Sequence, residues 1–157
     1  RPFPTEMSEQ ESQHFYDNCN ETDVAEAIRR RLGWIDIPAL RKALVGSVGA
    51  SLHLNKLDVF SGLAEIKVCH AYELCGEILD YMPDDPRKVE QVKPVYEVLP
   101  GWSESLTEVR SFEDLPQAAQ AYVRRIEELL GFKVTSIGVG PRTEDFIDCQ
   151  SSTIFSA

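Results

Sequence analysis

The sequence predicts an α/β fold in which a mixed sheet is flanked by helices. Segments 51–54, 65–73 and 133–137 have the length and apolar character of strands, and we expect them in one sheet. Segments 36–48 and 115–130 carry apolar residues at helical spacing, and we expect them to cover that sheet. The chain has 157 residues, of which 43% are hydrophobic and 27% charged, which is ordinary for a domain with its own core.

The N-terminal segment, residues 1–26, is polar and acidic. Pro2 and Pro4 exclude a regular start, so we expect extended structure followed by a loop or a short helix. Because Arg1 is not an initiator methionine, we expect the chain to be a fragment of a longer one.

A run of three arginines, Arg29-Arg30-Arg31, follows this acidic segment. The guanidinium fork matches the geometry of phosphate and carboxylate groups, so the run is a candidate anion site. The alternative is an exposed cluster that pairs with the acidic side chains nearby.

The first predicted helix, 36–48, has Asp36 as a candidate N-cap and Pro38 in its first turn. Gly46 or Gly49 is expected to end it. A strand and a polar loop follow, and a loop at the carboxyl end of a strand is where open α/β sheets bind ligands.

That polar loop is Asn55-Lys56-Leu57-Asp58. A carboxylate just beyond a strand can accept two hydrogen bonds from guanine, from N1–H and from the 2-amino group. Adenine has no donor at either position, so Asp58 would separate the two purines. Lys56 would lay its methylene stem along the base while its ammonium stays in water. The alternative is a surface loop without a ligand.

The middle of the chain continues with a turn at 59–63 and a surface loop at 82–86. Residues 92–100 alternate in hydrophobicity, and we expect an edge strand there because Pro94 cannot donate to a ladder.

The C-terminal third contains the clearest amphipathic helix, 115–130, with Gly131 as its C-cap. Gly138-Val139-Gly140-Pro141-Arg142 follows the next strand, and two residues without side chains let the backbone approach a ligand closely. The alternative is a tight turn. Residues 144–149 are expected to form a last strand.

Composition excludes several classes of function. A net charge of −10 disfavours non-specific nucleic-acid binding, and no apolar run approaches about 18 residues, so we expect no membrane span. The four cysteines form no Cys-x-x-Cys pair, and the histidines are not spaced as zinc ligands. We expect Cys69 to be a buried, reduced thiol of a cytosolic protein.

Several stretches, in the same order along nearly the whole chain, resemble the C-terminal part of the adenylosuccinate synthetase family. They are Pro2-Phe3-Pro4-Thr5-Glu6, Arg29-Arg30-Arg31, Gly33-Trp34-Ile35-Asp36, Asn55-Lys56-Leu57-Asp58-Val59, Ser61-Gly62-Leu63, Glu65-Ile66-Lys67-Val68-Cys69, Pro94-Val95-Tyr96-Glu97, Pro100-Gly101-Trp102-Ser103-Glu104-Ser105, Leu115-Pro116-Gln117-Ala118-Ala119, Tyr122, Ile126-Glu127-Glu128-Leu129 and Gly138-Val139-Gly140-Pro141-Arg142.

The resemblance implies a ligase that condenses IMP with aspartate, using GTP as co-substrate and Mg²⁺, to form adenylosuccinate on the route to AMP. GTP phosphorylates the 6-oxygen of IMP, and the aspartate amine then displaces it. The resemblance also implies a cytoplasmic protein that is homodimeric at full length and has no nucleic-acid or membrane partner. Residues 1–35 would be a substrate-loop region, and residues 36–157 the guanine-binding α/β part.

The family's motifs also imply roles for particular residues. Those assigned to GTP are Arg30, Lys56, Leu57, Asp58, Gly138, Val139 and Gly140. The run at 56–58 matches the guanine-recognition loop, and the run at 138–140 matches the loop that closes over the base. Arg29 and Arg30 are assigned to substrate, and Arg30 matches an arginine that reaches both the GTP phosphate and the aspartate site.

Two departures from the family pattern bear on function. Ala25-Glu26-Ala27-Ile28 stands where the family has Thr-Thr-Gly-Arg, which grips aspartate and IMP, and Glu26 would repel an aspartate carboxylate. Gly138 stands where the family often has serine, a milder change.

The sequence also lacks parts that phosphoryl transfer needs. It has no Gly-x-x-x-x-Gly-Lys phosphate loop. The family's phosphate loop, catalytic aspartate, catalytic histidine and metal ligands are expected upstream of this chain, which we therefore expect to be inactive alone. The alternative is a diverged, non-catalytic nucleotide-binding or interaction module of the same family. A regulatory GTPase shares only the Asn-Lys-Leu-Asp loop and is disfavoured.

Overall fold

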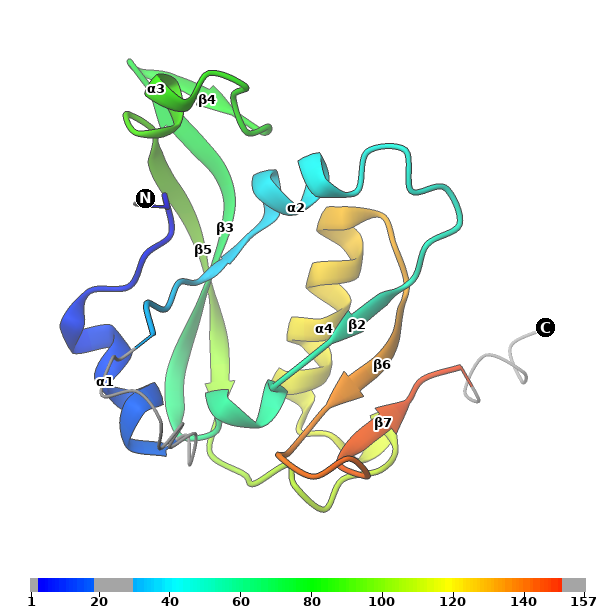
Figure 1. Ribbon diagram of the computed structural model, residues 1–157. Coiled ribbons are helices and arrows are strands. Elements are labelled where there is room, and N and C mark those ends of the chain that lie inside the picture. Colours follow the sequence, from blue (N-terminus) through cyan, green and yellow to red (C-terminus); the bar gives the residue numbers. More distant parts are fainter. Residues whose placement is uncertain (1–2, 19–29, 151–157) are drawn as a thin grey trace. The chain divides into compact units, whose positions relative to one another are not determined.

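The computed structural model describes residues 3–18 and 30–150, and its helices and mixed sheets confirm the predicted α/β class (Figure 1). The chain divides into two compact units. The first comprises residues 1–45 and 67–98, and the second comprises residues 46–66 and 99–157. The division falls within two long strands, β3 (Leu63–Leu74) and β5 (Lys93–Trp102).

The sheet of the first unit is built on β3. The short strand β1 (Ile35–Asp36) pairs parallel to β3, with Ile35 opposite Val68. β4 (Glu77–Leu79) pairs antiparallel to β3, and β5 also pairs with β3. Cys75 and Gly76, with φ of 52° and 85°, form the two-residue turn between β3 and β4, as such a hairpin requires.

The core of this unit lies along the same strands. Cys69 and Tyr72 are fully buried, which confirms Cys69 as a buried thiol. The residues that pack with them are Leu74, Leu79, Met82, Val92 and Tyr96.

The helices of the first unit begin at polar caps. α1 (Glu9–Asn18) starts with a capping box, in which Ser8 Oγ accepts from the Glu11 N–H and Glu11 Oε2 accepts from the Ser8 N–H. Asp36 accepts from the Ala39 N–H at 3.0 Å and so caps α2 (Ile37–Ala43), as predicted. A third, one-turn helix, α3 (Pro86–Val89), follows the predicted surface loop.

The expected length of the first predicted helix, 36–48, was wrong, because α2 ends at Ala43. Gly46 and Gly49 have φ of 82° and 76°, a conformation that an α-helix does not contain. Val48, counted as part of the apolar face, is 98% exposed. The helical spacing of apolar residues therefore continued past the true end of the helix.

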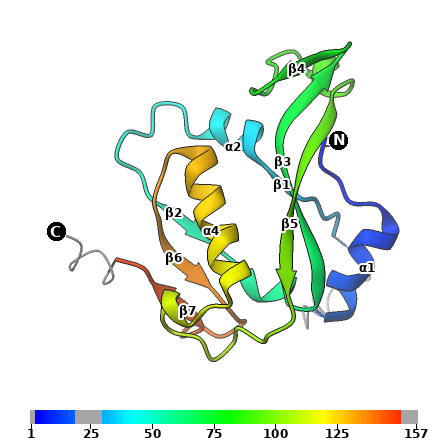
Figure 2. The same cartoon turned by 180° about the vertical axis from the view of Figure 1, so that it is seen from behind.

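The second unit has its own three-stranded sheet in the order β2 (Leu52–Leu54), β6 (Val134–Gly138) and β7 (Phe146–Asp148). β2 and β6 are parallel, and β6 and β7 are antiparallel. Helix α4 (Gln117–Leu130) runs alongside this sheet in both views (Figures 1 and 2). Short 3₁₀ turns, η1 (Leu57–Phe60) and η2 (Phe112–Asp114), follow β2 and precede α4.

Helix α4 confirms the strongest periodic signal in the sequence. Its inward face is formed by Ala119, Tyr122, Val123, Ile126 and Leu130. Gly131 ends the helix at φ 74°, and its N–H donates to Glu127 O at 2.8 Å.

The prediction that segments 51–54, 65–73 and 133–137 share one sheet was wrong. β2 and β6 do pair, but β3 belongs to the other sheet, where β1, β4 and β5 occupy its backbone hydrogen-bonding groups. Strand pairing joins segments far apart in the chain, and alternation within one segment does not identify its neighbour.

Candidate functional site

Two loops leave the same edge of the second sheet. Because β2 and β6 are parallel neighbours, with Leu54 opposite Ile137, their carboxyl ends lie together. Asn55 follows the first strand and Gly138 ends the second. A Cβ atom on Gly138 would lie 2.4 Å from Asn55 Oδ1 and 3.3 Å from Lys56 N, so a larger residue would displace the Asn55 side chain of the facing loop. The structure therefore brings together the two segments that the sequence singled out.

The first loop carries Lys56 in the left-handed conformation, with φ of 58° and ψ of 41°. This conformation turns the chain from β2 into η1, and Leu57 then enters the core with 1% of its surface exposed. Lys56 itself is exposed, as the proposed packing of its stem on a ligand requires.

Asp58 lies in the first turn of η1, where its backbone carbonyl accepts from the Ser61 N–H at 3.1 Å. Its carboxylate oxygen Oδ1 is shielded from solvent. A charged oxygen away from water interacts more strongly with a donor than a hydrated one does. The side chain as a whole is half-buried, and its role in recognising guanine stays a prediction.

The second loop is held by Asp145, a residue that the sequence analysis did not identify. The Val139 N–H donates to Asp145 O at 2.8 Å, and the Arg142 N–H donates to Asp145 Oδ2 at 3.0 Å. Arg110 also donates to Asp145, at 2.8 Å. An acidic residue three positions after an arginine was the available signal, but that spacing is common on surfaces.

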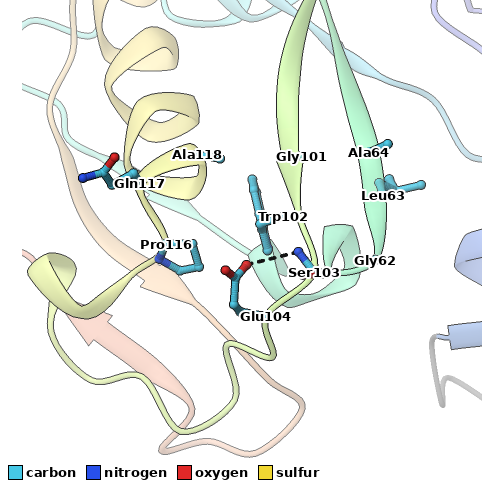
Figure 3. A pocket seen from close by; sticks show the side chains of 10 residues that line it. All are labelled: Gly62, Leu63, Ala64, Gly101, Trp102, Ser103, Glu104, Pro116, Gln117 and Ala118. Atoms are coloured by element: carbon cyan, nitrogen blue, oxygen red, sulfur yellow. Dashed lines mark hydrogen bonds between the residues drawn. The ribbon is translucent and has the colours of Figure 1, made fainter.

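The second unit also contains a cavity of about 650 Å³ (Figure 3). It is lined by Gly62, Leu63, Ala64, Gly101, Trp102, Ser103, Glu104, Pro116, Gln117 and Ala118. Trp102 Nε1 donates to Ser61 Oγ at 3.2 Å, and Ser61 Oγ donates to Glu104 O at 2.8 Å. None of the predicted nucleotide residues lines this cavity, although the Gly-Trp-Ser-Glu stretch belongs to the motifs of the resemblance.

The arginine run lies partly outside the described residues, because Arg29 falls in the segment that the structure does not describe. Arg30 is exposed in the first unit, and its carbonyl accepts from the Tyr16 hydroxyl at 2.6 Å. Arg31 forms an ion pair with Glu6 and stacks over the Phe3 ring at 5.1 Å. Arg31 thus follows the second alternative, pairing with a nearby acid, and the roles assigned to Arg29 and Arg30 stay predictions.

Two further properties concern the described residues, 3–18 and 30–150. Within them, no group of three or more His, Cys, Asp or Glu side chains is arranged to hold a metal ion. None of the helices in this part of the chain combines the length and the apolar character needed to cross a bilayer.

Comparisons with known proteins agree on one family. The sequence profile of the adenylosuccinate synthetase family matches residues 1–147. The adenylosuccinate synthetase of Lactobacillus delbrueckii subsp. bulgaricus is 45% identical over 150 residues, which cover 95% of this chain and 35% of that protein. Those of Oleidesulfovibrio alaskensis and Lactiplantibacillus plantarum are 40% and 43% identical, over 94% and 91% of this chain and 34% and 33% of theirs.

A solved structure gives the same result. The fully ligated adenylosuccinate synthetase from Plasmodium falciparum superposes with a TM-score of 0.85 at 34% identity, covering 94% of this chain and 36% of that one. The chain thus spans about a third of the length of the relatives it matches. On these matches, the chain belongs to the adenylosuccinate synthetase family.

Proposed function

We propose that this chain is the guanine-nucleotide-binding portion of a GTP-dependent ligase that joins IMP and aspartate to form adenylosuccinate. One observation carries the proposal. The loop that contains Asp58 and the loop that begins at Gly138 leave the same edge of the sheet, and the two loops contact each other. Family membership supports the reaction class.

Each loop has a distinct role in the proposed site. The Asp58 carboxylate accepts the N1–H and 2-amino hydrogens of guanine, and the Lys56 stem covers one face of the base. Leu57 anchors this loop through its buried side chain. Gly138, Val139 and Gly140 form the loop that closes over the base, and the glycines allow a close approach.

The remaining components of the reaction belong to the whole protein. Arg30 would reach the GTP phosphate and the aspartate site, with Arg29 beside it in the substrate loop. The phosphate loop, the catalytic residues and the Mg²⁺ ligands would lie in the part of the fold that this chain does not span. The proposal therefore assigns nucleotide binding to this chain and catalysis to a cytoplasmic, homodimeric full-length enzyme.

A second candidate is a non-catalytic nucleotide-binding module of the same family. It is favoured by Ala25-Glu26-Ala27-Ile28, which lacks the two hydroxyls and the arginine that the family uses to hold aspartate and IMP. This segment lies outside the described residues. The two candidates share the guanine site and differ in whether aspartate and IMP bind.

Calorimetric titration of GDP, ADP, IMP and aspartate into the protein tests both candidates. The proposed site predicts that GDP binds and ADP does not compete, and that Asp58→Asn abolishes GDP binding. Equal binding of GDP and ADP would refute the guanine assignment. Binding of IMP and aspartate supports the ligase, and binding of GDP alone supports the module.

A further inference from the structure

Asp145 is a buried acidic residue in the turn between β6 and β7, with its side chain 0% exposed. Its Oδ1 lies 2.8 Å from Arg110 Nη2 and 2.9 Å from Arg142 Nη2. Its Oδ2 accepts from the Arg142 N–H at 3.0 Å and from Arg142 Nε at 3.1 Å. Both carboxylate oxygens are thus bound by donors, and most of these donors are charged.

Such an arrangement keeps Asp145 ionised. A buried carboxylate needs charged partners, because burial alone favours its neutral form. Here the hydrogen bond and charge of Arg142, aided by Arg110, hold the pKa of Asp145 below its usual range. At neutral pH the residue therefore forms charge-assisted hydrogen bonds, which are stronger than neutral ones.

The same residue fixes the backbone of the loop from Gly138 to Arg142. The Val139 N–H donates to Asp145 O at 2.8 Å, so Asp145 contacts the loop at two backbone positions, Val139 and Arg142. A Cβ atom on Gly140 would lie 2.5 Å from Asp145 Oδ2, so the loop passes against the carboxylate as closely as glycine permits.

Arg110 connects this loop to a separate segment. Its Nη1 donates to Thr107 O at 2.6 Å and to Val109 O at 2.9 Å, which anchors the guanidinium on its own loop. Because these contacts fix Arg110, its bond to Asp145 ties the loop at 138–142 to residues 107–110.

We propose that Asp145 is a positioning residue for nucleotide binding, which holds the Gly138–Arg142 loop in its binding conformation before the ligand arrives. A loop that is ordered in advance loses less conformational freedom on binding, so its ligand binds more tightly. The inference rests on the proposed function, because it assigns the prearranged loop to the guanine-nucleotide site.

The test compares Asp145→Asn with Glu108→Gln. Asparagine retains the size and one acceptor of Asp145 but removes its charge. Glu108 contacts the same Arg142 guanidinium, at 3.2 Å, and its side chain is 86% exposed, so its substitution is the matched control. Two readouts are needed: affinity for GDP and ADP by calorimetry, and amide hydrogen exchange at 139–142 by mass spectrometry.

We expect Asp145→Asn to weaken GDP binding about tenfold, the scale of one lost hydrogen bond to a charged group. Amide exchange in the loop should rise, and the preference for GDP over ADP should persist because Asp58 is intact. Glu108→Gln should change neither readout. Arg110→Gln, which leaves the Arg142 contacts in place, should weaken GDP binding about threefold. It replaces Asp145→Asn as the test variant if Asp145→Asn does not fold.

Either of two results would overturn the inference: wild-type GDP affinity in Asp145→Asn, or loop exchange in Asp145→Asn like that of the Glu108→Gln control. If the wild-type protein fails to prefer GDP over ADP, the proposed function itself fails. That result is distinguishable because it appears before any variant is made.

Discussion

Replacing Gly138 by alanine tests the contact between the two loops of the candidate site. The added Cβ would lie 2.4 Å from Asn55 Oδ1, whereas ordinary contact begins at 3.4 Å, so the amide oxygen must move by about 1 Å. Forcing a side chain off its preferred rotamer costs about 0.5–1.5 kcal/mol. Lys56 N, at 3.3 Å, needs to yield only slightly. We expect a loss of about 1 kcal/mol in the free energy of unfolding.

The same displacement should weaken GDP binding, because a ligand that needs the original loop geometry must reverse it. About 1 kcal/mol corresponds to roughly a fivefold change in affinity. The control is Gly131→Ala at the opposite end of β6, where a Cβ meets nothing within 4 Å and only the positive φ opposes it. It should cost about 1–2 kcal/mol of stability and leave GDP affinity unchanged.

Urea denaturation and calorimetry measure both quantities for both variants. Unchanged GDP affinity in Gly138→Ala would refute the argument that these loops form one site. A destabilisation above about 3 kcal/mol would show that backbone, rather than the Asn55 side chain, blocks the space.

Three further predictions concern stability. Gly101→Ala should cost more than about 3 kcal/mol in urea denaturation, because its Cβ would lie 1.8 Å from Leu63 O, a backbone atom that cannot rotate away; a loss below about 1 kcal/mol would contradict this. Ile126→Ala, at a position 1% exposed in α4, should lower the free energy of unfolding by about 2–5 kcal/mol, and a neutral result would show that the helix face is not core. Hydrogen bonds from Lys67, and to a lesser extent from Ser8 and Trp34, lower the pKa of Glu11 from 4.5 to about 2. This carboxylate therefore stabilises the fold above pH 4.5, and the stabilisation disappears as the pH falls toward 2. Glu11→Gln should therefore be less stable than wild type at pH 7, and the difference should shrink across that acid window; a difference independent of pH would contradict it.

Patterns formed by neighbouring residues correctly predicted a helix, a helix cap and two loops at strand ends. α4 appears within two residues of its expected start because an amphipathic face and a C-cap glycine are both short-range signals. The Asp36 cap of α2 is of the same kind. The polar loop after β2 and the glycine pair after β6 were identified because each stands directly at a strand end.

The sequence did not predict properties that depend on distant segments. β3 was expected in the same sheet as β2 and β6, yet its partners are β1, β4 and β5. The loop from Gly138 to Arg142 is held by Asp145, which is in turn bound by Arg110. These two residues are 35 positions apart in the sequence and belong to no common motif. The end of α2 was missed because apolar residues continued at helical spacing into an exposed glycine-containing loop.

The most direct test of the guanine assignment is calorimetric comparison of GDP, inosine diphosphate and ADP with the wild-type protein. Inosine diphosphate keeps N1–H but lacks the 2-amino group, so it removes one of the two donors that Asp58 is proposed to accept. We predict affinities in the order GDP, inosine diphosphate, ADP, with each lost donor costing roughly tenfold or more. Equal affinities for the three nucleotides would contradict the proposed role of Asp58.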